Sequence, residues 1–205
     1  MSFQKASKIH FMFSNQISPF EYVSILVSII LGLGITQILA SFSDLLYDYK
    51  KIKFYWPHTC WIIFILFLHI QDWFITYELK EKPVWHLPEL FFILLYPISL
   101  FCVVKMLFPR NEKEDRCDMK MFYKNHFTLI FIVVAISISF SIIFNYFFLN
   151  KKLLEQVPLL VFLIVMVYSS IKNLKSEIFH KSVAVAIIAG SIVSVILNDN
   201  FWIIK

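Results

Sequence analysis

Residues 20–40 read FEYVSILVSIILGLGITQILA, and no charged side chain occurs from Tyr22 to Ser43. A helix needs about 20 apolar residues to cross a hydrocarbon layer of about 30 Å, so this stretch predicts a membrane-spanning helix. Five more apolar stretches of similar length follow it. The six predicted segments cover most of the chain: residues 20–46, 55–77, 87–108, 127–149, 153–171 and 178–197.

The composition of the 205-residue chain agrees with these segments. Hydrophobic residues make up 59% of it, charged residues only 16%, and the mean hydropathy is +0.72, outside the range of soluble globular domains. Backbone groups inside lipid must find hydrogen-bond partners within their own segment, which makes each span a helix. We therefore expect an all-α fold: a polytopic transmembrane helical bundle forming one domain, residues 1–205. The fifth segment is marginal, so counts of four or five spans stay open.

The distribution of Lys and Arg predicts the orientation of the chain, because short loops rich in these residues stay on the cytoplasmic side. With the N-terminus outside, twelve of the 19 Lys and Arg residues lie on the inner side. This arrangement predicts a multi-pass membrane protein with both termini outside.

Helix boundaries are also readable. Ser18, Pro19 and Glu21 have the form of a capping box, and residues 87–89 (Leu-Pro-Glu) place a carboxylate in the first turn of the third segment. The connector of residues 109–124 is nearly neutral, which argues against direct nucleic-acid binding. Its apolar residues suggest a short interfacial helix there: Met119, Phe122 and Tyr123. We expect the three cysteines to be free thiols.

Two segments carry small residues at every fourth position, a pattern that lets helices approach closely in lipid. We call these two sets the small-residue stripes. The first segment contributes Ser24, Ser28, Gly32 and Thr36, and the sixth contributes Ser182, Ala186, Gly190 and Ser194. We predict that both helices pack through these faces, either inside the monomer or between subunits of a homo-oligomer.

The second segment carries two ionisable residues well inside the span, His69 and Asp72. Such groups are costly in a membrane and normally face the bundle interior. At a spacing of three residues the two side chains are able to hydrogen-bond to each other. One interpretation is a proton or cation relay, and the other is a buried polar pair that fixes helix packing.

Other polar residues surround this pair in the expected topology. Glu21, Glu89 and Asn145 fall in the same half of the membrane as His69 and Asp72. An acidic mouth of this kind would concentrate cations if the groups lined a water-filled path. Glu21 and Glu89 are already explained as helix caps, so Gln37 and Asn145 are the candidate interior partners of the pair.

Catalytic, metal and cofactor sites find little support. The chain has no Gly-x-Ser-x-Gly elbow, no His-Glu-x-x-His motif and no paired intramembrane aspartates, and its cysteines lack metal-ligand spacing. His58 and His69 lie eleven residues apart on one helix, too far to share a haem iron. We therefore expect no enzyme activity, no metal and no cofactor.

Residues 20–39, the sequence YWPHTCW at 55–61 and the Leu-Tyr-Pro element at 95–97 resemble a family of small bacterial multi-span proteins. The similar part covers about half of the chain. That family includes the membrane accessory proteins encoded beside type VI-B CRISPR effectors. The resemblance implies an accessory or effector protein of a bacterial cytoplasmic (inner) membrane, without catalysis of its own. Its implied partner is a cytosolic RNA-guided antiviral nuclease, whose activity it modulates.

Three functional hypotheses follow. The first is a non-enzymatic, oligomeric accessory or effector protein that regulates such a partner or perturbs membrane integrity. The second is a small ion channel or proton-coupled transporter that works through His69 and Asp72. The third is an integral membrane enzyme acting on lipid or peptide, which would need His and carboxylate side chains at one interface.

Overall fold

The computed structural model describes residues 18–109 and 117–197, which are almost entirely helical. Its helices are α2 (Pro19–Tyr47), α3 (Trp56–Tyr77), α4 (Leu87–Leu107), α5 (Met119–Phe147), α6 (Val157–Ile171) and α7 (Glu177–Leu197), with a 3₁₀ turn η1 (Leu153–Gln156) before α6. Counting η1 and α6 together, six helices in this part of the chain are long and apolar enough to cross a membrane. The predicted all-α bundle with six candidate spans is confirmed, and the marginal fifth segment keeps its predicted bounds.

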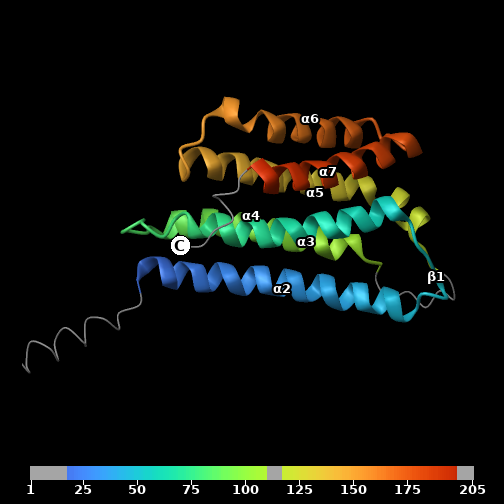
Figure 1. Cartoon of the computed structure of the whole chain (residues 1–205), viewed down its shortest axis with the longest axis horizontal. Helices are drawn as coiled ribbons and strands as arrows, with labels where there is room; N and C mark the ends of the chain where they lie inside the picture. The colour runs from blue at the N-terminus through green and yellow to red at the C-terminus, as the bar shows by residue number, and fades with distance from the viewer. Residues whose placement is uncertain (1–17, 110–116, 198–205) are drawn as a thin grey trace, which may run out of the picture.

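The helices lie roughly side by side, with α2 and α6 at the two outer edges of the bundle (Figure 1). Helix α2 packs on α3 and α4, α5 packs between α4 and α6, and α7 packs on α3. Successive helices run in opposite directions, so the connectors alternate between the two ends. We call the end with the α2–α3, α4–α5 and α6–α7 connectors the basic end, since its described residues are rich in lysine.

Side chains close several helix ends as the sequence predicts. The Ser18 Oγ accepts from the Glu21 N–H at 3.1 Å, and the Glu21 carboxylate accepts from the Ser18 N–H at 2.6 Å. At the start of α4, the Glu89 carboxylate accepts from the His86 N–H at 3.0 Å. Both predicted first-turn carboxylates therefore satisfy N–H groups that have no partner inside their helix.

Helix α5 differs from the expectation. The predicted interfacial helix around residues 119–123 is wrong, because Met119–Phe147 is one continuous helix of 29 residues. Met119, Tyr123 and Phe127 recur every four residues and are almost fully buried, so the first two turns share the packed face of the span. Lysines on the other side of these turns lower the local hydropathy and hide that face in the sequence.

Two very short strands join the connectors at the basic end. Strand β1 (Ile52–Lys53) pairs in parallel with β2 (Cys117–Asp118), and the Cys117 N–H donates to the Lys51 carbonyl at 3.0 Å. The Asp118 carboxylate then caps α5 by accepting from the N–H groups of Lys120 and Met121 at 2.8 and 3.2 Å. The start of α5 is thereby fixed to the α2–α3 connector. All three cysteines are free, as predicted.

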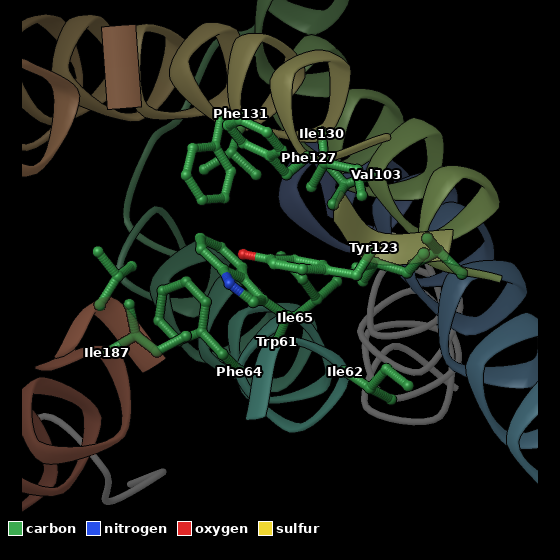
Figure 2. Close-up of a cluster of buried hydrophobic side chains, with 14 of the residues drawn as sticks. Trp61, Ile62, Phe64, Ile65, Val103, Tyr123, Phe127, Ile130, Phe131 and Ile187 are labelled. Atoms are coloured by element: carbon green, nitrogen blue, oxygen red, sulfur yellow. The ribbon is translucent and has the colours of Figure 1, made fainter. Parts of the chain in front are cut away.

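The main core is aromatic and lies between α3, α5 and α7. Figure 2 shows Trp61 and Phe64 of α3 facing Phe127 and Phe131 of α5, with Ile187 of α7 beside them. The Trp61 and Phe131 ring centroids are 5.2 Å apart, and neither side chain is exposed. Large rings that interlock in this way fill the space between helices at the density of a protein interior.

Of the two alternatives predicted for the small-residue stripes, packing of α2 and α7 inside the chain is not what the structure shows. Helix α2 packs through the neighbouring register of Val23, Val27, Leu31, Gly34, Ile38 and Leu45, and α7 packs through His180, Val183, Ala184 and Ile187. The stripe residues Gly32, Thr36, Ser182, Ala186 and Gly190 are exposed or half-buried, as are Ser24, Ser28 and Ser194, and none of the eight is buried. Mainly larger side chains occupy the interior, because they fill wider gaps between helices. A contact between subunits through the stripes therefore remains the open alternative.

Replacing Trp61 with alanine should create a cavity in the aromatic core and lower the free energy of unfolding by about 3–5 kcal/mol. Trp56→Ala is the matched control, because Trp56 is 47% exposed and its loss should cost about 0.5 kcal/mol or less. Reversible unfolding of both variants in mixed micelles, followed by circular dichroism, measures the difference. Equal losses for the two variants would contradict the assignment of the core.

Candidate functional site

The candidate site lies midway along α3, where His69 is fully buried. Its Nδ1 is 2.7 Å from the Ile65 carbonyl one turn earlier, so in the neutral ring Nδ1 carries the hydrogen and Nε2 is the free acceptor. The ring packs against α2 at Gly34, where a Cβ atom would overlap the Nε2 end of the imidazole. Gly34 therefore provides the space that lets α2 and α3 approach with a histidine between them.

Asp72 lies one turn further along α3 and is 7% exposed. Its side chain lies near Tyr96 on α4, and its backbone carbonyl accepts from the Thr76 hydroxyl at 2.9 Å. Within residues 18–109 and 117–197, neither Asp72 Oδ2 nor His69 Nε2 has a hydrogen-bond partner. A buried acceptor without a partner costs free energy, and His69 and Asp72 each carry one such atom within three residues of α3.

His69 and Asp72 do not hydrogen-bond to each other, although their spacing allows it. The His69 ring is held by its own helix through Ile65 and turns its other nitrogen to α2, while Asp72 lies near Tyr96 of α4. The shared spacing of three residues puts both groups on the buried side of α3. This spacing does not lead to a hydrogen bond between them, because a neutral imidazole has only one N–H and the Ile65 carbonyl accepts it.

The other predicted polar residues lie at separate places. Glu21 is exposed in the first turn of α2, where it caps the helix. Gln37 accepts from the Lys105 ammonium at 2.5 Å and donates to the Ser41 hydroxyl at 2.7 Å, which ties α2 to the last turn of α4. Asn145 on α5 is buried, and its Oδ1 has no partner among the described residues. None of the three hydrogen-bonds to His69 or Asp72.

Two residues of this site were missed by reasoning from the sequence alone. Gly34 lies beside the stripe residue Gly32 and was not separated from it, and Tyr96 stood out only as part of a resemblance. A signal for Gly34 did exist, since it falls in register with Val27, Leu31 and Ile38 on the most apolar face of α2. Tyr96 stands beside Pro97 in an apolar helix and carried no such pattern.

Two further buried histidines lie towards the basic end, and each uses one ring nitrogen. His58 Nε2 is 2.7 Å from the Leu107 carbonyl at the end of α4, and His180 Nδ1 is 3.1 Å from the Tyr123 hydroxyl. Both contacts join residues of different helices that are about 50 or more positions apart in the sequence. In the parts of the chain that the structure describes, no group of three or more His, Cys, Asp or Glu residues is placed to hold a metal ion.

Two groups just outside the spans have shifted pKa values. Partial desolvation tends to raise the pKa of Asp118, but the N–H groups of Met121 and Lys120 and the Lys53 ammonium outweigh it and hold the pKa below its ordinary value. For Tyr55, burial and the Glu177 carboxylate raise the pKa despite the nearby Lys120. At neutral pH Asp118 is therefore a carboxylate and Tyr55 a neutral phenol.

Comparisons with models of protein families, with curated proteins and with solved structures find no match to this chain. No relative supplies a function or a set of site residues. The functional inference therefore rests on the exposed stripes and on the His69 and Asp72 region.

A methyl group at position 34 tests how closely α2 approaches His69. Gly34→Ala should destabilise the protein by about 1–3 kcal/mol through overpacking, and Gly34→Ala combined with His69→Ala should recover most of that loss.

Gly32→Ala is the matched control, because nothing lies within 4 Å of a Cβ there and alanine is the better helix former by about 0.5–1 kcal/mol. The free energy of unfolding in mixed micelles is measured for the wild type and for the three variants. If Gly34→Ala and Gly32→Ala are equally stable, the close contact between Gly34 and His69 is absent.

Proposed function

We propose that this chain is a non-enzymatic accessory or effector protein of a bacterial inner membrane that acts as a homo-oligomer. The observation that carries the proposal is the outward orientation of both small-residue stripes. A Cβ atom added at Gly32 or Gly190 would meet nothing within 4 Å outside its own helix, so both positions are open to another helix. In lipid, small residues let helix backbones approach closely, and the van der Waals packing that results favours helix association.

A groove beside the α2 stripe supports a second copy of this chain as the occupant. The groove has a volume of about 440 Å³ and lies between α2 and α3. Eight residues line it: Phe20, Ser24, Ile25, Ser28, Ile29, Trp73, Thr76 and Tyr77. Ser24 and Ser28 belong to the stripe, so a helix seated on the stripe has a recess into which its larger side chains fit.

The accessory role itself is supported by the resemblance of residues 20–39, 55–61 and 95–97 to membrane proteins of antiviral defence. In this role the protein modulates an RNA-guided nuclease, alters membrane integrity, or does both. The full burial of His69 counts against a histidine-dependent enzyme at the membrane surface, because a substrate has no access to the ring. The lysine-rich end then faces the cytoplasm, with both termini outside.

Leucine at the stripe positions should block oligomer formation by preventing close approach of the helices. We expect Gly32→Leu and Gly190→Leu to weaken self-association by about tenfold or more, equivalent to about 1.4 kcal/mol. Single-molecule photobleaching of labelled protein in liposomes measures the subunit number as a function of the protein-to-lipid ratio.

Ala189→Leu is the control on α7, since Ala189 is exposed but lies outside the stripe. Self-association that is unchanged in both glycine variants would rule out the stripe contact. The accessory role would be abandoned if the wild-type protein were strictly monomeric and its gene lay far from any nuclease or defence gene.

A second candidate function is a small ion channel or proton-coupled transporter. It is favoured by one observation: the unpartnered His69 Nε2 and Asp72 Oδ2 in the middle of the bundle, among the described residues. Buried groups that accept protons are frequent along intramembrane proton paths. His69 is next to α2 and Asp72 next to α4, so a relay through them would run across the α2–α3–α4 interface rather than along a hydrogen-bonded pair.

Proteoliposome flux tests this second candidate. If it holds, Asp72→Asn and His69→Gln should each reduce proton-driven dye quenching to the level of empty liposomes. Asp44→Asn and His126→Gln are the matched controls, because both residues are exposed and His126 bonds its own helix at Phe122 as His69 does at Ile65. Wild-type flux in the Asp72 and His69 variants would remove the mechanism.

A further inference from the structure

The basic end carries a polar pocket that belongs to neither candidate function. The pocket has a volume of about 350 Å³, in the range of small-molecule sites, and lies between the first turns of α5 and the α6–α7 connector. It is lined by Asp118, Lys120, Met121, Lys124, Asn125 and Lys175. Three of these six side chains are lysines, which favours an anionic ligand.

The charges around the pocket do not cancel. The Glu177 carboxylate lies 2.7 Å from the Lys120 ammonium, 2.9 Å from that of Lys181 and 4.0 Å from that of Lys124. A single carboxylate thus faces three ammonium groups.

The other charged groups beside the pocket leave the excess charge positive. Asp118 is paired with Lys53 at 3.4 Å, and Lys175 makes no ion pair within the described residues. Among residues 18–109 and 117–197, five lysines against two carboxylates leave a local charge of +3. Closely spaced ammonium groups repel one another, and an anion in the pocket relieves that repulsion.

The position of the pocket along α5 indicates where the anion comes from. A helix of 29 residues is about 43 Å long, whereas the hydrocarbon layer is about 30 Å thick. Residues 127–147 contain no charged side chain and suffice to cross that layer. The first two turns, which line the pocket, therefore lie at the depth of the lipid headgroups.

An apolar side chain completes the match to a lipid. Met121 lines the pocket and is 67% exposed, so an acyl chain leaving the headgroup has an apolar surface to follow. The Asn125 amide adds a neutral donor to the lysine ammonium groups, which suits the phosphate oxygens. Basic pockets between spans at the cytoplasmic side are a recurrent way to hold anionic headgroups.

We propose that this pocket binds the phosphodiester headgroup of an anionic phospholipid, with Lys124 and Lys175 as the main contacts and Lys120 and Asn125 beside them. The bound lipid bridges α5 to the α6–α7 connector. Phosphatidylglycerol and phosphatidylcholine of equal chain length are the probes, since they share the phosphodiester and differ in net charge.

The test is native mass spectrometry of the purified full-length protein in neutral detergent, with each lipid added at equal concentration. We expect phosphatidylglycerol to bind more tightly than phosphatidylcholine, and its affinity to fall by about tenfold in Lys124→Gln/Lys175→Gln. Lys50→Gln/Lys172→Gln is the matched control. It removes the same charge from exposed lysines at the same end, outside the pocket, and should bind as the wild type does.

Several results would overturn the proposal. Equal losses in the two double variants would mean diffuse attraction to the lysine-rich end, and equal binding of both lipids would mean no recognition of charge. Displacement of the lipid by excess inorganic phosphate would make a free anion the ligand. Circular dichroism and the lipid-free melting temperature of each variant separate a lost site from a misfolded protein.

Discussion

Every backbone N–H and C=O group that enters a hydrocarbon layer needs its hydrogen-bond partner within the protein, and the rest of this structure follows from that constraint. It makes each apolar stretch a helix and confines irregular chain to short connectors. It also explains why several polar side chains hydrogen-bond to backbone groups at helix ends. Ser18 and Asp118 accept from free N–H groups, and His58 lies within hydrogen-bond distance of the Leu107 carbonyl where α4 stops.

Packing between the helices obeys a second rule, because lipid tails are as apolar as leucine and association depends on shape. This chain uses two kinds of shape. Trp61, Tyr123 and Phe131 interlock across the centre, whereas the glycines of the stripes remain on the outside. Gly34, which belongs to neither stripe, lies inside and makes room for the His69 ring. The outer faces of α2 and α7 thus combine the small residues of the stripes with exposed large apolar side chains such as Ile29 and Ile192.

Polar chemistry is divided between two levels of the bundle. In the middle, His69 and Asp72 are buried singly against different helices, and each keeps an atom without a partner among the described residues. At the basic end, lysines gather around Glu177 and Asp118, where the headgroup layer provides water and counter-charges. The first level suits a proton or a structural role, and the second suits an anionic surface, so the two levels do not compete for one function.

Much of the architecture was predictable because length and hydropathy are local properties. The stretch 20–46 became α2 (Pro19–Tyr47), and the Ser18 and Glu21 cap was readable from spacing alone. The start of α5 was not, because the lysines of its first turns lower the hydropathy although Met119 and Tyr123 are buried. Hydropathy averages over all faces of a helix, whereas burial concerns one face.

The amino-acid sequence by itself determined that the chain is a helical membrane protein, where its spans lie, and that His69 and Asp72 are on one side of α3. Only the tertiary structure decided which face of each helix is inside. Small residues at every fourth position are equally compatible with an inner and an outer contact, and the larger side chains of the adjacent register settled the matter on α2. For the same reason, only the tertiary structure places Gly34 and Tyr96 at the site. Contact with a residue of another helix produces no pattern in the local sequence.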